Sequence, residues 1–84
     1  MNVESIGDRL DSVALLDPVT YDRKDGKRKG EVGLIAEEVY KVLPEIVSKN
    51  DDGEIEGIEY SKLTVYLISA VKQLKRELDE LKNG

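Results

Sequence analysis

The stretch EVGLIAEEVYKVLPEIVS, residues 31–48, joins two kinds of apolar spacing with no linker between them. Its first part, residues 31–35, places apolar side chains in the short pattern that favours a β-strand. Its second part, residues 36–44, repeats apolar side chains at helical spacing. Pro44 restricts the backbone of the residue before it, so the helix is expected to end there. The sequence predicts a strand that runs directly into a short helix.

Two β-hairpins are predicted on either side of this helix. Residues 19–21 and 31–35 are interpreted as the arms of the first hairpin, joined by the polar turn KDGKRKG. Residues 46–47 and 55–58 are interpreted as the arms of the second, joined by KNDDG.

The two ends of the chain are predicted to be helical. Residues 7–18 carry apolar side chains at helical spacing, with Asp8 as the expected N-cap. Residues 60–82 contain neither Gly nor Pro and are predicted to form one long helix. The predicted fold class is therefore α+β. Residues 1–59 form a small head of short helices and β-hairpins, and residues 60–84 form a C-terminal helix that assembles into a parallel, trimeric coiled coil.

Composition limits the possible functions of this 84-residue chain. One domain of this size buries a modest core, and the absence of Cys and His removes disulfides and the usual zinc ligands. Oligomerisation is the remaining common way to enlarge the core. The net charge of −5 argues against a nucleic-acid surface as the main function. No segment approaches the length of about 20 apolar residues that a membrane helix needs.

A heptad seam runs along the predicted long helix. Its a and d positions are occupied by Thr64, Leu67, Val71, Leu74, Leu78 and Leu81. The apolar face is wide in the first half and has charged borders in the second half, where Glu77 at g and Lys82 at e have the spacing that pairs across a parallel interface. Val at a with Leu at d favours a coiled coil of two helices, while the wide upper face favours a coiled coil of more than two helices. A single amphipathic helix lying on its own domain stays open as an alternative.

Two spacings are compatible with catalysis but lack the context that catalysis needs. Ser69 and Lys72 form an S-x-x-K pair, known from serine acyl-enzymes with a lysine base. Both lie at outer heptad positions, which favours solvated helix surface. Glu37 and Glu38 are adjacent on a helix and point to different sides, unlike a working carboxylate pair. No enzyme is predicted from this inventory.

Two polar segments suggest ligands but are better explained as turns. A basic cluster consists of Arg23, Lys24, Lys27, Arg28 and Lys29. It lies in a predicted turn and is interleaved with acidic residues, which favours a solvated hairpin tip over a nucleic-acid or acidic-protein contact. The segment NDDGEIE, residues 50–56, resembles a calcium loop in composition but lacks the Gly and Glu that an EF-hand requires. It is predicted to be a turn.

Three stretches carry a resemblance to a known family: residues 16–26, 30–48 and 52–78. They resemble the C-terminal intramolecular chaperone domain of phage tail fibres and tailspikes, the peptidase S74 family. The resemblance covers about residues 2–81. It is most specific at GLIAEEV followed by LPEIV, and at EYSKLTVYLISAVKQLK. One departure is minor, because Glu37 stands where the family usually has Gln.

The resemblance implies a domain that trimerises, holds three fibre chains in register while they fold, and then cuts itself off. In the family the cut is made by a Ser–Lys pair in a motif like S-D-x-x-x-K, just before the Ser. Aligning residues 2–6 with the family's sequence after that motif places both catalytic residues upstream of Met1. No Ser in this chain has a Lys five positions later. We therefore expect no catalytic residue, cofactor or metal in this chain, and no protease activity.

The resemblance also implies partners and a location. The partners are two further copies of the chain and the upstream fibre portion of the same polypeptide, with no nucleic acid and no membrane. The location is the host cytoplasm during phage assembly, with the parent protein in the virion tail. Two alternatives stay open: a plain oligomerisation adaptor, and the equivalent domain of a self-cleaving, membrane-bound transcription factor.

Overall fold

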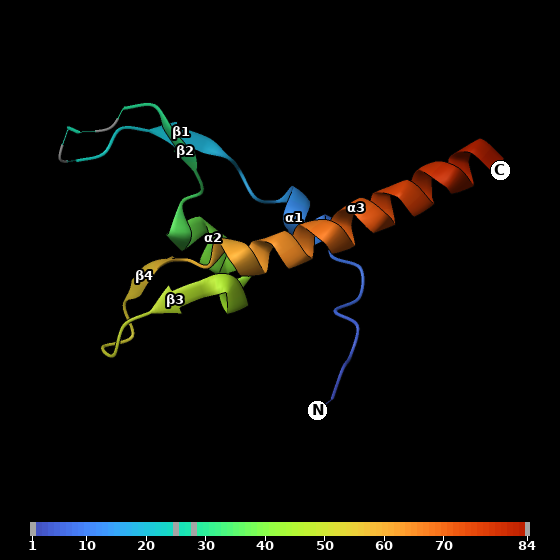
Figure 1. Cartoon of the computed structure of the whole chain (residues 1–84), viewed down its shortest axis with the longest axis horizontal. Coiled ribbons are helices and arrows are strands. Elements are labelled where there is room, and N and C mark those ends of the chain that lie inside the picture. Colours follow the sequence, from blue (N-terminus) through green and yellow to red (C-terminus); the bar gives the residue numbers. More distant parts are fainter. Residues whose placement is uncertain (1, 25, 28, 84) are drawn as a thin grey trace. The chain divides into compact units, whose positions relative to one another are not determined.

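The computed structural model describes residues 2–24, 26–27 and 29–83. Its elements, coloured along the chain in Figure 1, follow the order α1 (Leu10–Ala14), β1 (Val19–Tyr21), β2 (Glu31–Gly33), α2 (Ala36–Val42), the 3-10 helix η1 (Pro44–Ile46), β3 (Val47–Lys49), β4 (Ile55–Ile58) and α3 (Tyr60–Asn83). Short helices, two hairpins and a 24-residue C-terminal helix confirm the predicted mixed α+β class. The chain divides into two compact units, one formed by Leu16–Glu59 and the other by residues 2–15 with α3.

The core of the first unit lies where α2 ends and the chain passes through η1 into β3. α2 packs on η1, β3 and β4. The side chains of Val39, Leu43 and Ile46 are at most 1% exposed, and Val47 is also buried. The backbone N–H of Glu59 donates to the carbonyl of Ile46 at 2.7 Å, which fastens the end of the unit to its core.

Both predicted hairpins are present as separate antiparallel pairs. In the first, Thr20 lies opposite Val32. In the second, Val47 lies opposite Ile58, and the register shifts after Ser48. The second turn is closed by one side chain, because Asn50 Oδ1 accepts hydrogen bonds from the backbone N–H groups of Asp52 and Glu54, both at 2.9 Å. The prediction of a turn in this segment is confirmed.

Three local predictions were wrong. Asp8 does not cap the first helix, since Arg9 occupies the N-cap and its own side chain makes no capping hydrogen bond. The second strand ends at Gly33 rather than Ile35, because Ile35 is the extended residue that begins α2. Ile46 is not a strand residue, because Pro44 starts a 3-10 turn that carries Ile46 into the core before β3 begins.

The second unit consists of α3 with the N-terminal segment packed on it. α1 packs against α3. The helix forms as predicted from its composition, with Lys82 in the last turn, where a cation interacts favourably with the helix dipole. The α3 residues buried in the structure are Leu63 and Ala70.

Candidate oligomerisation surface on α3

The predicted seam of α3 is exposed in the single chain. Its five apolar members are Leu67, Val71, Leu74, Leu78 and Leu81, with exposed fractions between 43% and 79%. Thr64 is also exposed, and its hydroxyl donates to the carbonyl of Tyr60 at 3.2 Å within the helix. A row of large apolar side chains facing water over four turns is unusual for a soluble surface and is typical of an interface.

A different face of α3 is occupied by the chain itself. Leu63 and Ala70 are buried at g positions of the heptad, and Tyr66 and Gln73 are half-buried at c positions. On a helical wheel the c positions lie away from the a and d positions, whereas the g positions flank d. The intramolecular contacts therefore border the seam on its g side and leave its a and d side chains exposed.

The seam has a shallow apolar hollow in its upper half. A groove of about 270 Å³ is lined by Thr64, Leu67, Ile68, Val71 and Lys72. Ile68 at an e position and Val65 at a b position are 57% and 53% exposed and widen the apolar surface. The apolar surface of the upper half is therefore broadened at Ile68, whereas Leu63 and Ala70 on the other side of the seam are buried by the chain itself.

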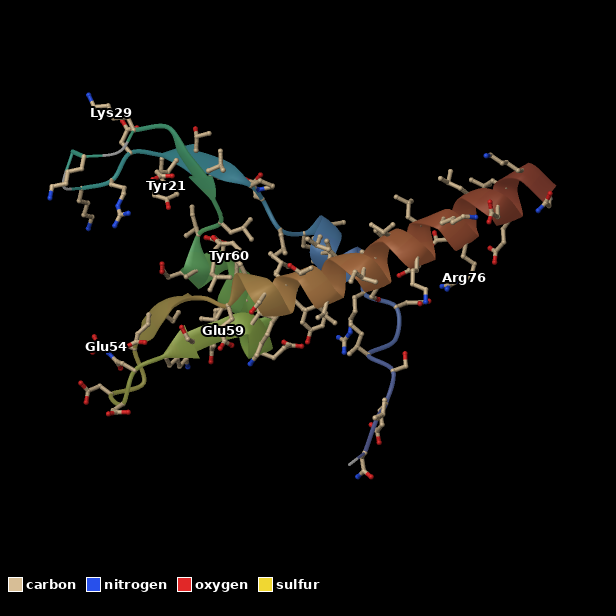
Figure 2. All side chains as sticks on the ribbon, viewed as in Figure 1. Tyr21, Lys29, Glu54, Glu59, Tyr60 and Arg76 are labelled. Carbon is tan, nitrogen blue, oxygen red and sulfur yellow. The ribbon has the colours of Figure 1, made fainter. Side chains whose placement is uncertain are left out.

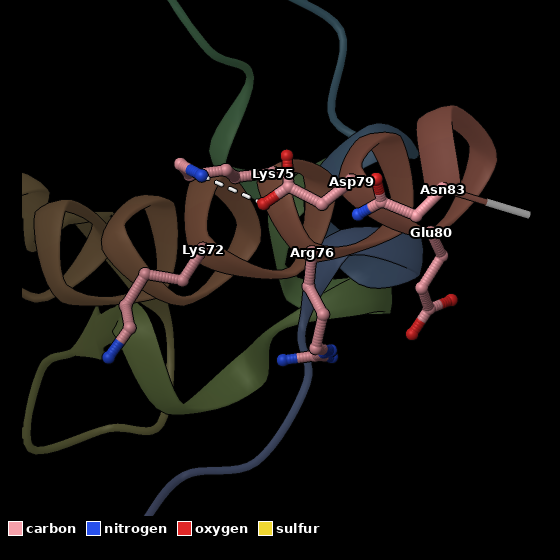
Figure 3. A pocket seen from close by; sticks show the side chains of 6 residues that line it. All are labelled: Lys72, Lys75, Arg76, Asp79, Glu80 and Asn83. Carbon is pink, nitrogen blue, oxygen red and sulfur yellow. Dashed lines mark hydrogen bonds and ion pairs between the residues drawn. The ribbon is translucent and has the colours of Figure 1, made fainter.

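Charged side chains border the lower half of α3, and several pair along the helix. Figure 3 shows the ion pair of Lys75 with Asp79, whose Nζ and Oδ2 atoms are 2.8 Å apart, beside an open groove of about 500 Å³. Glu77, predicted to pair with Lys82 of a neighbouring chain, accepts a hydrogen bond from Gln73 Nε2 at 2.8 Å in the single chain. Lys82 is exposed.

The S-x-x-K pair is engaged in a structural contact. Ser69 Oγ donates to the backbone carbonyl of Gly7 at 2.7 Å. Lys72 is exposed and shares with Ser69 a cavity of about 320 Å³. Because the Ser69 hydroxyl donates its hydrogen bond to this carbonyl, Lys72 does not accept it and does not act as its base. This geometry fits the structural interpretation of the pair.

The remaining polar candidates lie apart from the seam. Lys29, labelled in Figure 2, belongs to the exposed loop of the first hairpin together with the other described members of the basic cluster; Arg28 lies outside the described residues. Glu54, at the second turn in the same figure, pairs with the Asn50 side chain. Glu38 forms an exposed ion pair with Lys41. Among the described residues, no three carboxylates gather as a metal site requires.

Three contacts between the N-terminal segment and α3 were not predicted. Arg76 donates to Asp8 at 2.6 Å, and the carboxylate raises the pKa of the guanidinium. Gln73 Oε1 accepts from the backbone N–H of Leu10 at 3.0 Å, and the third contact joins Ser69 to Gly7. The partners are 62 to 68 residues apart, so no local spacing in the sequence indicates them.

The helices in the described part of the chain all fall short of the length and apolarity that crossing a membrane requires.

The comparisons with known proteins agree with one another. The profile of the Peptidase_S74 family, described as chaperone of endosialidase, matches residues 1–48, more than half of the chain. Over 80 residues the chain is 36% identical to the long tail fiber protein Gp37 of Enterobacteria phage M1, and equally to that of Enterobacteria phage Ox2. The alignments cover 87% of this chain and 32% of each relative, so the chain spans about a third of their length. By this match the chain belongs to the Peptidase_S74 family, the chaperone of endosialidase.

Proposed function

We propose that this chain is the intramolecular chaperone module of a phage tail fibre or tailspike. It trimerises through the seam of α3, sets three fibre chains in register while they fold, and is released by self-cleavage upstream of residue 1. It acts in the host cytoplasm during assembly, and the parent protein ends in the virion tail. Family membership and the similarity to two long tail fibre proteins support the tail-fibre context.

The observation that carries the proposal is the exposed seam. Burying these side chains removes apolar surface from water at about 25 cal/mol for each Å². A single chain leaves them exposed, while its own contacts use c, f and g positions of α3. A second and a third copy are suited to cover them, because each copy presents the same heptad stripe.

Trimerisation is useful to a fibre for a physical reason. Three long chains that must meet in one register pay an entropic cost before any inter-chain contact forms. A trimer at their C-termini makes the remaining contacts intramolecular, with an effective concentration in the millimolar range for short connections. After release, slow unfolding keeps the finished fibre intact. The module therefore needs to act once, during assembly.

Sedimentation equilibrium at tens of micromolar tests the assembly. The expected mass is that of three chains. Leu74→Asp puts a charge into the seam of each chain, at a cost of several kcal/mol when buried unpaired, and is expected to give single chains. Asn83→Asp introduces the same residue at an exposed f position outside the seam and is the matched control, expected to stay trimeric. A single-chain mass for the unmutated protein contradicts the proposal.

The release step has its own test. The chain is extended upstream through the native S-D-x-x-x-K segment and a short piece of fibre. The extended chain is expected to split just before the Ser, and replacement of that Ser or Lys by Ala is expected to stop the split without preventing trimer formation. An extended chain that trimerises and never splits supports the plain oligomerisation adaptor instead.

A further inference from the structure

We propose that residues 5–10, here called the strap, fix the place where the upstream chain joins α3, and that Ser69, Gln73 and Arg76 are positioning residues for the cleavage junction. This inference rests on the proposed function and deepens it. It assigns a role to the contacts that no local sequence pattern indicated.

Three polar contacts hold the strap on α3. Ser69 Oγ donates to the Gly7 carbonyl at 2.7 Å, and Gln73 Oε1 accepts from the Leu10 N–H at 3.0 Å. Arg76 donates to the Asp8 carboxylate at 2.6 Å and extends from the helix in Figure 2. The α3 partners are separated by four and three residues, so they lie on successive turns of one side of the helix.

Further contacts, within the strap and with Tyr66 of α3, fix its shape. The Arg9 side chain donates to the Ile6 carbonyl at 2.8 Å, and its guanidinium lies 5.6 Å from the centre of the Tyr66 ring. The Gly7 N–H donates to Ser5 Oγ at 3.0 Å, and Gly7 has φ +75°, a conformation that L side chains rarely adopt. The strap therefore has a defined path rather than being a loose tail.

The strap and the seam use different positions of the same helix. Tyr66 and Gln73 are c positions, and Ser69 and Arg76 are f positions, whereas the seam is formed by a and d. Coiled-coil partners bury a and d and leave c and f outside. The strap can thus stay attached to the outside of an assembled trimer.

This arrangement links the register of α3 to the upstream chain. Each residue before Gly7 adds at most about 3.5 Å of reach. Attachment at Gly7 and Asp8 limits how far the junction strays from α3, and it does so in the same way in every copy. Holding a reacting bond in place raises the rate of an intramolecular step because less orientational freedom is lost.

The test uses the parent chain with its native junction and measures the trimer mass and the rate of splitting. Arg76→Ala is expected to keep the trimer and slow splitting about threefold, as the loss of one exposed contact implies. Arg76→Ala with Ser69→Ala is expected to slow it about tenfold. The exchange Asp8→Arg with Arg76→Asp is expected to recover most of the rate. Lys75→Ala, which removes a pair outside the strap, is the control and is expected to leave the rate unchanged.

A second measurement uses the 84-residue chain and does not depend on cleavage. Gln73→Ala is expected to speed hydrogen exchange of the Leu10 amide about fivefold, the value of one hydrogen bond. If Gln73→Ala leaves the exchange rate of the Leu10 amide unchanged, the proposed role of the strap is contradicted. It is also contradicted if the strap variants form trimers and split at the unmutated rate. Parent chains that never trimerise or never split contradict the proposed function instead, so the two failures are distinguishable.

Discussion

The apolar residues of α2 and η1 and those along α3 follow similar spacings, but only the first set is buried by its own chain. Val39, Leu43 and Ile46 are at most 1% exposed, whereas Leu74 and Leu81 are 47% and 79% exposed. The first set is covered because the chain turns back at Pro44 and places β3 and β4 over α2. The second lies along α3, a continuous helix of 24 residues, and the N-terminal segment makes hydrogen bonds with Ser69, Gln73 and Arg76 of this helix instead.

This difference separates two sources of stability. The core around Leu43 stabilises one chain at any concentration. The seam, in the proposed trimer, stabilises only assembled chains, so its contribution grows with protein concentration. Variants that shorten one side chain in each set measure this distinction directly.

The largest expected effect is that of Leu74→Ala in the proposed trimer. Each chain loses about 2 to 5 kcal/mol of stabilising free energy from packing, and the loss occurs in all three chains of the trimer. Thermal unfolding followed by circular dichroism at several concentrations is expected to show a lower midpoint that depends more steeply on dilution. A drop that is equal at every concentration contradicts a role for Leu74 between chains.

Leu43→Ala is expected to have the next largest effect, because it leaves a cavity in the core of Leu16–Glu59. The expected loss is about 3 kcal/mol in the free energy of unfolding, measured with urea on the Leu74→Asp background. Ile46→Val is a milder variant at the same site, with an expected loss of about 1 kcal/mol. Leu15→Ala, at an exposed position, is the control. A comparable loss of stability in this variant contradicts the assignment of the loss to the buried core.

The smallest expected effect concerns the second turn. Gly53 has φ +83°, so Gly53→Ala is expected to cost about 1 kcal/mol although open space surrounds the added methyl group. Gly57→Ala is the matched control, since Gly57 lacks a positive φ and its added Cβ meets only Ser48 Oγ at 4.0 Å. The measurement is again urea unfolding of the single chain. Equal losses at the two glycines contradict backbone strain as the cause.

Several features followed from the sequence because their signals are local. The absence of Gly and Pro from residues 60–82 and the heptad spacing predict α3 within one residue of its observed end. Pro44 ends α2 through its effect on the neighbouring backbone. The turn around Asn50 followed from residue types that form turns. In each case the deciding interactions lie within about one helical turn of the residue.

Other features were decided only by tertiary structure. Asp8 was predicted to cap a helix, but its carboxylate meets Arg76, 68 residues away. Ile46 lies in the 3-10 turn that Pro44 starts, but its complete burial depends on the packing of α2, β3 and β4 around it. The sequence by itself determined the elements and the heptad stripe of α3, because these depend on neighbours along the chain. Which face of α3 is covered, and by which segment, depends on where distant segments return, and no local pattern encodes that.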